Sequence, residues 1–593
     1  MATDPYYVDE SKPWFTKEAG WPDEVPKNTT FEHTPLGDVL RQTAKEHPNK
    51  NVIWFQGEYM TFKELDEAVD RFATALHNLG LRKGDVLAMI LPNCFQYVVG
   101  YYAAQRLGVI SSGVNPTYKA NEVRHQLKTI NAKCLVVLDA LYEGQIAPIR
   151  DDVPVRIYIK TNVTDMMKLP GWKKFLGKKL GKIPTGEVPD AKDFNDLMKT
   201  APKLPDVKID PDDVATYIMT GGTTGVPKAA MLTHFNCTSN THQIKLWVFK
   251  IKPGAMIVGI LPLYHSFAMT VVMNSCVRIG ACMMLFPKPP SEDELCQTIQ
   301  DIGPDDAVIY PGAEILFKRM SEFKDLDKYD IKGKLSVCVS GAGPLHRPVQ
   351  EAFEKATGAR LGEGYGLTEA GPVVSAHPFW GNRKIGTIGL PVPGTEWRIV
   401  ELDDPKKEIP ALTTIEKDGE VVPKSGEIIC SGPQIMKGYL NQESDTAADI
   451  VEMEGKRWLL TGDIGFMDEH GRVTINDRKK QLIKNKGWSV FPSEVETLMM
   501  GHEAVTECAV AGIPDEKAGE CIKAWCALKP EYQGKLTAEE LMAWAKDNMT
   551  FYKVPTYVEI IDEIPKSPIG KVMRRELQEA DPIYIAWKEK NAG

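Results

Sequence analysis

The residues with the most evident chemistry lie in one short loop, TGGTTGVPK, which runs from Thr220 to Lys228. Its glycines leave the backbone accessible, and hydroxyl side chains and one lysine are interleaved with them. Backbone N–H groups, hydroxyls and a cation together are suited to hold a polyphosphate. The loop is not a Walker A motif, because Val226 and Pro227 separate Gly225 from the lysine. The same composition is typical of a Gly/Thr-rich surface turn, so the loop alone leaves both interpretations open.

Two further motifs carry groups that suit a nucleotide. In EGYGLTEAG (363–371), glycines at 364 and 366 would let the backbone approach a flat ligand on which Tyr365 stacks, and Glu369 is a hard oxygen ligand suited to Mg²⁺. In TGDIG (461–465), an aspartate expected at a tight turn can accept hydrogen bonds from ribose hydroxyls. Each motif is common when taken singly, since Gly-aromatic-Gly and Asp-containing turns occur in many proteins.

A lysine and a histidine complete the candidate chemistry. Lys571 follows Gly570 in PKSPIGKVMRREL (565–577), where it can either reach into a site or remain solvated. His265 lies in LPLYHSF, and it is either a packed core histidine or part of a reaction site. These residues are hundreds of positions apart, so the fold must bring them together.

Composition limits the possible architectures and partners. A chain of 593 residues is too long for one hydrophobic core, which predicts at least two domains. The net charge of −9 argues against a general nucleic-acid binder. The 11 cysteines show no zinc-binding spacing and several lie in apolar runs, which predicts buried thiols in a reducing cytoplasm. The N-terminal sequence lacks the pattern of a signal peptide, and no apolar run is long enough to span a bilayer.

Helical and strand patterns alternate over most of the chain. The pattern predicts a helix that begins after a capping Thr61 and ends at Gly80. Its apolar face comprises Phe62, Leu65, Val69, Phe72 and Leu76. Short apolar runs at 86–93, 109–115, 255–263, 281–286, 306–310 and 335–341 alternate with helical stretches such as 96–108. This order is typical of an α/β fold with a largely parallel sheet.

The last third of the chain changes character. Gly/Pro turns and short alternating strands predict a small β-rich subdomain over 397–472. A polar stretch at 477–481, DRKKQ, indicates a domain boundary. Beyond it, helices at 493–502 and 537–549 and strands at 505–513, 522–530 and 557–562 predict a compact α+β unit. The second of these helices carries a capping box formed by Thr537 and Glu540.

One segment has the composition of a membrane-surface helix. MMKLPGWKKFLGKKLGKI (166–183) places lysines between apolar residues that recur at helical spacing. Its lysines are Lys168, Lys173, Lys174, Lys178, Lys179 and Lys182. Pro170, Gly171 and Gly177 weaken the helix. The alternative is a helix packed on its own protein with a solvated lysine face.

Together the four motifs resemble the adenylate-forming (ANL) superfamily, which includes acyl-CoA synthetases, adenylation domains of nonribosomal peptide synthetases and firefly luciferase. TGGTTGVPK, EGYGLTE, TGDIG with DRKKQLIKNKGW, and KSPIGKVMRREL occur in that family's order, over residues 35–580. LPLYHSF, IMTGGTTG and EGYGLTE are most similar to bacterial long-chain fatty acyl-CoA synthetases. IKNKGW is more similar to 4-coumarate–CoA ligases and luciferases, which leaves the acid less certain than the chemistry.

The resemblance implies a fold and its division into domains. A large N-terminal domain would combine two α/β subdomains and a small β-barrel, and a small mobile α+β C-terminal domain would follow. The implied segments are an N-terminal extension (1–34), an adenylation domain with the ATP and acyl sites (35–477), and a C-terminal domain with the catalytic lysine and the CoA face (478–593). The hinge between the last two would be Lys480.

The resemblance also implies the reaction, which is ATP-dependent activation of a carboxylic acid. The carboxylate would attack the α-phosphorus of ATP to form an acyl-AMP and pyrophosphate, and the thiol of coenzyme A would then displace AMP. Both steps depend on neutralising charge. Thr220 and Glu369 would bind Mg²⁺. The acid is expected to be a medium- or long-chain fatty acid, and the enzyme to be cytoplasmic, with peripheral contact to the inner face of the membrane through 166–183.

Site residues carry over from the matching motif positions. The implied catalytic residues are Lys571, Glu369, Thr220 and His265. The implied ATP and AMP contacts are Thr220, Gly221, Gly222, Thr223, Thr224, Gly225, Lys228, Gly341, Ala342, Gly343, Glu363, Gly364, Tyr365, Gly366, Thr368, Asp463, Ile475, Arg478 and Lys571. The acyl pocket would include His265, Phe267 and Met269, with walls at 269–276 and 373–377. Lys484, Lys486 and Gly487 would face CoA after the C-terminal domain rotates.

Within this set the implied roles differ. Lys228 and the glycine loop would hold the β- and γ-phosphates, and Thr368 would contact the α-phosphate. The segments 341–343 and 363–365 would form the adenine pocket. Asp463 and Arg478 would bind the ribose hydroxyls. Lys571 would bridge the carboxylate and the α-phosphate.

Three alternatives remain open on the sequence alone. The chain could be an aromatic-acid CoA ligase of the coumarate or benzoate kind, an acyl-AMP ligase that loads a carrier protein, or a non-catalytic membrane-binding protein on this fold. The intact KNKGW segment favours CoA over a carrier. The presence of Lys571, Glu369, Thr220 and Asp463 argues against a catalytically inactive protein. A phosphate-hydrolysing NTPase is disfavoured because the Walker A spacing is missing.

Overall fold

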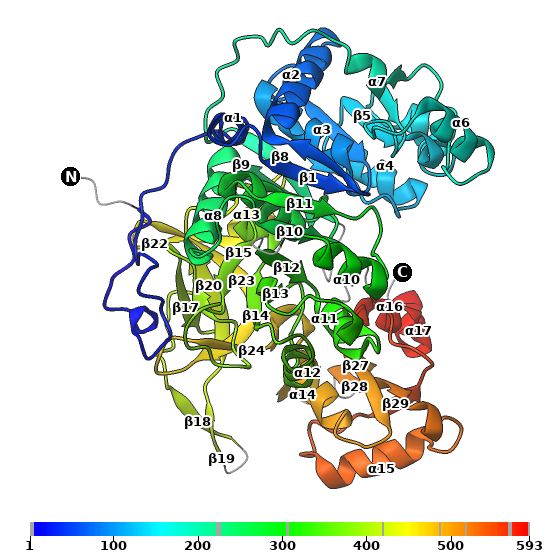
Figure 1. Cartoon of the computed structure of the whole chain (residues 1–593). Helices are drawn as coiled ribbons and strands as arrows, with labels where there is room; N and C mark the ends of the chain where they lie inside the picture. Colours follow the sequence, from blue (N-terminus) through cyan, green and yellow to red (C-terminus); the bar gives the residue numbers. More distant parts are fainter. Residues whose placement is uncertain are drawn as a thin grey trace. The chain divides into compact units, whose positions relative to one another are not determined.

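The computed structural model describes residues 5–220, 227–303, 307–417, 420–485, 488–515, 519–566 and 572–590. The chain divides into two compact units. Unit 1 comprises Met1–Gly221, Pro227–Glu396 and Ser431–Leu459, and unit 2 comprises Gly222–Val226, Trp397–Cys430 and Leu460–Gly593. Helices and sheets are mixed in both units, which confirms the predicted α/β architecture (Figure 1).

A nine-stranded sheet forms one core of unit 1, in the order β16-β15-β14-β13-β12-β10-β11-β1-β2. The strands from β14 to β1 run parallel, and β2, β15 and β16 are antiparallel to their neighbours. Their bounds are β1 Asn51–Phe55, β2 Glu58–Thr61, β10 Met256–Gly259, β11 Cys282–Leu285, β12 Val308–Gly312, β13 Leu335–Ser340, β14 Leu361–Gly366, β15 Val373–Ala376 and β16 Leu390–Pro391. Helices α10 (Glu292–Gln300), α11 (Glu314–Glu322) and α12 (Arg347–Thr357) pack apolar side chains against this sheet.

An eight-stranded sheet forms a second core of unit 1, in the order β21-β9-β8-β4-β3-β5-β6-β7. The strands from β8 to β7 run parallel, whereas β9 and β21 are antiparallel additions. Their bounds are β3 Val86–Ile90, β4 Ile110–Gly113, β5 Cys134–Leu138, β6 Ile157–Thr161, β7 Lys192–Asp193, β8 Val214–Thr220, β9 Lys228–Thr233 and β21 Gly438–Tyr439. The two sheets confirm the predicted pair of largely parallel α/β subdomains.

Local sequence signals determine several helices of unit 1. Helix α2 (Phe62–Asn78) begins at Thr61, whose side chain accepts from the Glu64 N–H while the Glu64 carboxylate accepts from Thr61. The five apolar residues predicted to share its face are all fully buried. The other helices of this unit are α1 Leu36–Glu46, α3 Phe95–Leu107, α4 Ala120–Thr129, α5 Tyr142–Gln145, α6 Gly171–Lys179, α7 Phe194–Leu197, α8 His234–Trp247, α9 Ser275–Ile279 and α13 Glu443–Asp449.

Residues 5–35, before α1, form an arm that packs on the rest of unit 1. Trp14, Phe15, Trp21 and Phe31 are buried, and the Trp21 ring lies edge-on to that of Trp247 at 5.4 Å. The arm therefore contributes apolar surface to the core.

Unit 2 contains the C-terminal α+β segment and most of the predicted β-rich segment, of which residues 431–459 belong to unit 1. In the β-rich segment, β24 (Val473–Arg478) pairs with β23 (Lys456–Met467), in a sheet ordered β17-β20-β23-β22. Its other strands are β17 Glu396–Val400, β20 Gly426–Ser431 and β22 Ile450–Met453, and β18 Thr414–Lys417 pairs with β19 Glu420–Pro423. The C-terminal sheet has the order β26-β25-β28-β27, with β29 on β28.

Five elements of the C-terminal segment match the predicted ones closely. They are α14 Pro492–Met499, β27 Val505–Asp515, β28 Gly519–Leu528, α15 Ala538–Asn548 and β29 Tyr557–Ile560. The segment also contains four elements that were not predicted, β25 Ile483–Asn485, β26 Trp488–Val490, α16 Arg574–Ala580 and α17 Pro582–Lys590. The capping box that was predicted from Thr537 and Glu540 begins α15.

Two expectations about apolar residues can be compared directly. All 11 cysteines are buried and free, as predicted. No helix in the described ranges is both long and apolar enough to cross a bilayer.

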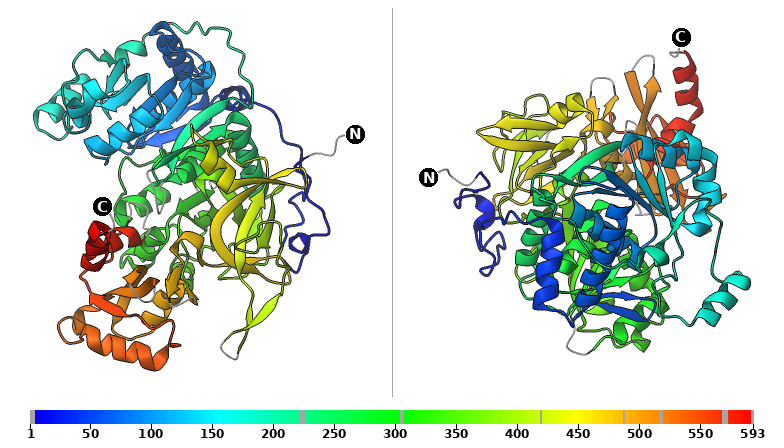
Figure 2. Two further views of the ribbon diagram at one scale, coloured as in Figure 1. Left: turned by 180° about the vertical axis from the view of Figure 1, so that it is seen from behind. Right: turned by 90° about the horizontal axis from the view of Figure 1, so that it is seen from above.

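The basic segment 166–183 forms only a short helix, α6, which lies at the margin of unit 1 (teal in Figure 2, right). Pro170 precedes the helix and Gly181, whose φ is +67°, follows it, so the helix is much shorter than the apolar periodicity indicated.

Candidate active site

The two ends of the glycine loop lie side by side in unit 1. Strands β8 and β9 are antiparallel, and Thr220 at the end of β8 is the direct partner of Lys228 at the start of β9. The Thr220 hydroxyl donates to the Lys228 carbonyl oxygen over 3.4 Å. Gly221, Gly222, Thr223, Thr224 and Gly225 lie outside the described residues. The hairpin thus presents one hydroxyl and one cation together at the ends of the loop.

Lys228 is held between an acid and an aromatic ring. Its Nζ lies 2.9 Å from an Asp445 carboxylate oxygen and 5.0 Å from the centre of the Tyr439 ring. Tyr439 belongs to β21, which pairs with β9 so that Tyr439 lies opposite Ala230. The sheet therefore places this ring next to the lysine.

Tyr439 also connects Lys228 to the EGYGLTE motif. Its hydroxyl donates to Glu369 Oε1 over 2.8 Å and lies 3.0 Å from Asp449 Oδ2. Burial, reinforced by these two carboxylates, raises the pKa of Tyr439 well above its ordinary value, so the hydroxyl remains a donor. The Met436 N–H donates to the Glu369 carbonyl oxygen at 2.8 Å, which anchors the short turn Thr368–Ala370. Lys228 and Glu369, predicted to share a site, are thereby brought together.

The LYHSF segment meets the same motif through two hydroxyls. Ser266 Oγ and Thr368 Oγ1 lie 3.0 Å apart. His265 precedes this contact, and its Nδ1 lies 3.3 Å from the Phe267 N–H, while the Met269 N–H donates to its carbonyl oxygen. Residues Ala268–Asn274 then form a fully buried π-helix. A π-helix is rare and frequently marks a functional site, and periodicity did not predict it.

The segment 341–343 adjoins both of these motifs. A Cβ added to Gly341 would lie 3.0 Å from the Phe267 ring and 3.4 Å from the Gly364 carbonyl oxygen. The two glycines of EGYGLTE were predicted to let a ligand approach the backbone, but the structure shows another reason why these positions are glycine. Added Cβ atoms at Gly364 and Gly366 would strike Val339 and the Pro372 carbonyl, so protein packing already requires both glycines.

The EGYG residues lie on a strand and not on a glycine turn. Glu363, Gly364, Tyr365 and Gly366 belong to β14, between β13 and β15. Burial raises the pKa of Glu363 to about 8. Its N–H donates to His377 Nδ1 at 3.1 Å. His377, in a predicted acyl-pocket wall, is thus joined directly to the predicted adenine segment.

Unit 2 carries the remaining described candidates. Asp463 was predicted to lie at a tight turn, and this prediction is wrong. The residue lies within β23, opposite Arg478 on β24. The Arg478 Nε lies 2.9 Å from Asp463 Oδ1. Ile475 pairs with Gly465 on the same two strands. The chain continues through Lys480 in a short 3₁₀ turn to Lys484 on β25, whose N–H donates to Glu520.

Three further predicted residues, besides the five loop residues 221–225, cannot be placed. Lys571, Lys486 and Gly487 lie outside the described residues. The described candidates therefore form two sets. Unit 1 holds Thr220, Lys228, His265, Phe267, Met269, Gly341, Ala342, Gly343, Glu363, Gly364, Tyr365, Gly366, Thr368 and Glu369, and unit 2 holds Asp463, Ile475, Arg478, Lys480 and Lys484.

Comparison with known proteins identifies the family. The model of the AMP-binding enzyme family matches residues 40–440, and that of the AMP-binding enzyme C-terminal domain matches residues 494–571. The chain belongs to the AMP-binding enzyme family. The resemblance to adenylate-forming enzymes is thus confirmed, as is the implied fold with a large N-terminal and a small C-terminal part.

Relatives of this AMP-binding enzyme include ligases for two kinds of acid. A long-chain-fatty-acid–CoA ligase of Bacillus subtilis is 36% identical over 97% of this chain and 99% of its own. The 4-coumarate–CoA ligase 1 of Arabidopsis thaliana is 30% identical over 92% of each chain. The crystal structure of a long-chain-fatty-acid–CoA ligase of Archaeoglobus fulgidus superposes with a TM-score of 0.66, at 27% identity over 90% of this chain and 98% of that one.

Several residues of this AMP-binding enzyme's site were missed in the sequence. Tyr439 contacts Glu369 and Lys228, Asp445 pairs with Lys228, and Asp449 accepts from the Tyr439 hydroxyl. Glu427 accepts from Lys479 and from the Gly462 N–H beside Asp463. They lie in unremarkable stretches such as MKGYLN. The position of Tyr439 beside Lys228 follows from the pairing of β21 with β9. A single sequence does not show that pairing.

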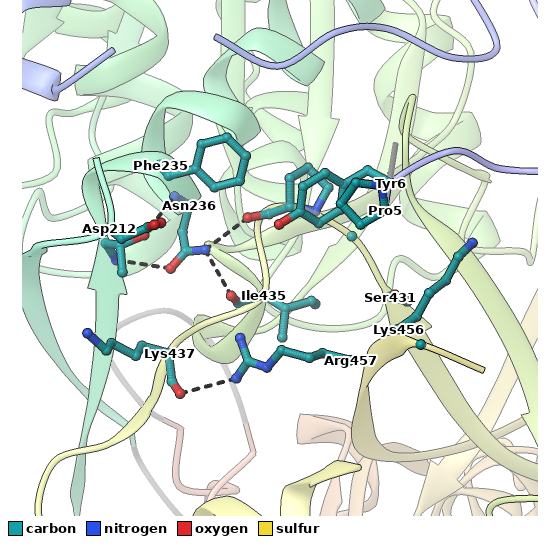
Figure 3. Close-up of a pocket in the computed structure, with 14 residues that line it drawn as sticks. Pro5, Tyr6, Asp212, Phe235, Asn236, Ser431, Ile435, Lys437, Lys456 and Arg457 are labelled. Atoms are coloured by element: carbon teal, nitrogen blue, oxygen red, sulfur yellow. Dashed lines mark hydrogen bonds between the residues drawn. The ribbon is translucent and has the colours of Figure 1, made fainter. Parts of the chain in front are cut away.

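A cavity of about 350 Å³ lies elsewhere in unit 1, beside the start of α8 (Figure 3). Its walls include Tyr6, Phe235, Asn236, Lys437, Lys456 and Arg457. The Asn236 amide donates to the Pro433 and Ile435 carbonyls, Arg457 donates to two further carbonyls, and Lys456 pairs with Glu396. None of the described site residues lines it, and its polar groups serve to join chain segments.

Proposed function

We propose that this AMP-binding enzyme converts a medium- or long-chain fatty acid into its CoA thioester. The acid and ATP give acyl-AMP and pyrophosphate, and the CoA thiol then displaces AMP. The observation that carries the substrate assignment is the similarity to the Bacillus subtilis long-chain-fatty-acid–CoA ligase over nearly the full length of both chains. The enzyme is an AMP-forming acid–thiol ligase.

The cluster in unit 1 supports the assignment of the phosphate site. Lys228 binds the β- and γ-phosphates together with the glycine loop, and Thr368 contacts the α-phosphate. The Glu369 and Asp449 carboxylates both contact the Tyr439 hydroxyl, and carboxylate oxygens are hard ligands that suit Mg²⁺. Thr220 and Glu369 hold the ion, which neutralises phosphate charge when bound. No group of three or more metal-binding side chains occurs among the described residues, consistent with an ion whose other ligands come from the nucleotide.

The neighbouring segments supply the adenine and acyl sites. Residues 341–343 and 363–366 line the adenine, and the close approach of Gly341 to the Phe267 ring supports an acyl pocket beside them. His265, Phe267 and Met269 line the reacting end of the acid. The close packing of Ser266 on Thr368 supports a carboxylate position next to the α-phosphate.

The remaining roles belong to unit 2. Asp463 and Arg478 bind the ribose hydroxyls, with Ile475 beside them. Lys571 bridges the carboxylate and the α-phosphate as the acyl-AMP forms. Rotation about Lys480 then brings Lys484, Lys486 and Gly487 to CoA, so that the segment 478–593 acts as one mobile domain after the adenylation domain 35–477 and the extension 1–34.

A panel of acids tests the substrate assignment. Thioester formation from CoA should be measured with acetate, hexanoate, palmitate, benzoate and 4-coumarate. Burial of each additional CH₂ contributes about 0.8 kcal/mol, so kcat/KM should rise about fourfold per methylene until the pocket is filled. An aromatic acid with a kcat/KM well above every fatty acid would make the Arabidopsis relative the better guide. Transfer to a carrier protein in place of CoA would favour the carrier-loading alternative.

The enzyme also contacts the membrane through the segment 166–183. Trp172, Phe175 and Leu180 are 65%, 67% and 60% exposed. Lysines of the same short helix lie among these apolar side chains, and Lys173 Nζ is 5.6 Å from the Trp172 ring. Exposed aromatic residues beside lysines suit the interface of an anionic bilayer. A fatty acid partitions into that bilayer, so an enzyme held peripherally at its inner face meets substrate at a higher local concentration.

A further inference from the structure

Tyr439 occupies a central position between the charged groups of the proposed phosphate site. Its side chain is 6% exposed, and its backbone is fixed by pairing with Ala230 on β9. The hydroxyl lies within hydrogen-bond distance of Glu369 and Asp449, and the ring faces Lys228. One side chain therefore touches both a proposed Mg²⁺ ligand and a proposed phosphate ligand.

The Tyr439 hydroxyl has one proton to donate but two carboxylate neighbours. A tyrosine donates one hydrogen bond, yet carboxylate oxygens of Glu369 and Asp449 lie 2.8 Å and 3.0 Å from the same oxygen atom. One donor thus holds two anionic groups close together. Such an arrangement keeps a carboxylate in a defined orientation and leaves local negative charge that a cation compensates.

The ring restrains the lysine in a different way. The Lys228 ammonium lies over the aromatic face at 5.0 Å and is paired with Asp445 on the other side. Asp445 and Asp449 both come from α13, so one short helix provides the counter-charge for the lysine and an acceptor for the hydroxyl. The lysine is half-buried and cannot swing freely into solvent.

We propose that Tyr439 is a positioning residue for the nucleotide-bound cation. Its hydroxyl orients the Glu369 carboxylate for Mg²⁺, and its ring separately orients Lys228 for the phosphates. This inference rests on the proposed function, because it takes from it that Glu369 binds the cation and Lys228 binds ATP. Tyr439 itself touches no reacting atom.

The two functions can be separated by substitution. Tyr439→Phe removes only the hydroxyl and keeps the ring beside Lys228. Tyr439→Leu removes both. The matched control is Tyr329→Phe, because the Tyr329 hydroxyl also donates to a carboxylate, that of Asp293, on α10. Melting temperatures of all variants identify any loss of folding.

Binding of nucleotide without fatty acid gives a readout independent of catalysis. Calorimetric titration should compare ATP with EDTA against ATP with Mn²⁺, and electron paramagnetic resonance should count the bound Mn²⁺. Tyr439→Phe is expected to weaken Mn²⁺–ATP binding about tenfold, as removal of outer partners of a metal ligand typically does, and to leave metal-free ATP binding unchanged. Tyr439→Leu should weaken both. Tyr329→Phe should change neither.

Each failure has its own signature. If the parent protein binds ATP equally with and without Mn²⁺, the metal role in the proposed function is wrong. If the parent protein shows the metal dependence but Tyr439→Phe retains it fully, the positioning role is wrong. A Tyr439→Phe protein that melts lower but binds Mn²⁺–ATP normally likewise makes the hydroxyl merely structural.

Discussion

Arg478 and Asp463 face each other across neighbouring strands of unit 2, with the guanidinium Nε 2.9 Å from the carboxylate Oδ1. The Asp463 side chain is buried, while that of Arg478 is 42% exposed. The pair therefore holds the aspartate rigidly and leaves the arginine accessible to a ligand. This asymmetry suits a site for the two ribose hydroxyls.

Asp463→Asn should raise the KM for ATP. Hydrogen bonds to a charged group contribute about 1.5–3 kcal/mol, so loss of the carboxylate corresponds to a change on the order of tenfold or more. Unfolding should change little, because Arg478 can turn to solvent. The matched control is Asp468→Asn, which breaks the pair with Arg472 in the turn that joins β23 to β24. That control should lower the melting temperature and leave the KM for ATP unchanged; the reverse pattern would contradict the ribose assignment.

Lys571→Ala should abolish the first half-reaction selectively. The lysine is assigned to neutralise charge as the α-phosphorus is attacked, and each ~1.4 kcal/mol of lost stabilisation slows that step tenfold. Pyrophosphate exchange is expected to fall by orders of magnitude, while thioester formation from supplied acyl-AMP largely survives. Lys566→Ala is the control, since Lys566 is paired with Glu507. Normal exchange by Lys571→Ala would show that another group has this role.

Charge reversal in the segment 166–183 should detach the protein from membranes. Each lysine near an anionic surface contributes about 1 kcal/mol, and salt screens this attraction. Replacing Lys173, Lys174, Lys178 and Lys179 with Glu should abolish co-sedimentation with anionic vesicles and leave activity on soluble hexanoate nearly intact. Reversal of the four exposed lysines Lys318, Lys324, Lys328 and Lys332 is the control for net charge. If the parent protein stays in the supernatant at low salt, α6 is only a lysine-rich surface helix.

His377 should make the protein less stable in mild acid. Burial lowers its pKa to about 4 from an ordinary 6.5, so the unfolded chain binds the proton more readily than the folded one. Its stabilising contribution is present above pH 6.5 and is lost as the pH falls toward 4. His377→Asn keeps an acceptor for the Glu363 N–H and should lose less stability than the parent between pH 7 and 5 in urea unfolding. Equal losses would mean that His377 does not contribute to the acid sensitivity.

Local signals predicted much of the fold. The capping boxes at Thr61 and Thr537 and the apolar runs of β10, β11 and β13 act over a few residues, so the sequence displays them directly. The predicted turn at Asp463 was wrong because Gly462 adopts φ +71 within a continuing strand. Family motifs predicted that Lys228, Thr368 and Glu369 share a site, and in the structure Tyr439 contacts both Lys228 and Glu369. Tyr439 was missed because its role depends on strand pairing across more than two hundred residues.

The burial of every cysteine makes this chain suited to site-selective labelling. Burial raises the pKa of Cys94, Cys237 and Cys430 to about 12, so these thiols ionise little at neutral pH and react slowly with maleimides. A thiol introduced at an exposed position such as Glu143 on α5 or Glu539 on α15 would be the fast-reacting one. A dye pair at these two positions, one in each unit, would let single-molecule fluorescence follow the separation of the units through a turnover, without removal of any native cysteine.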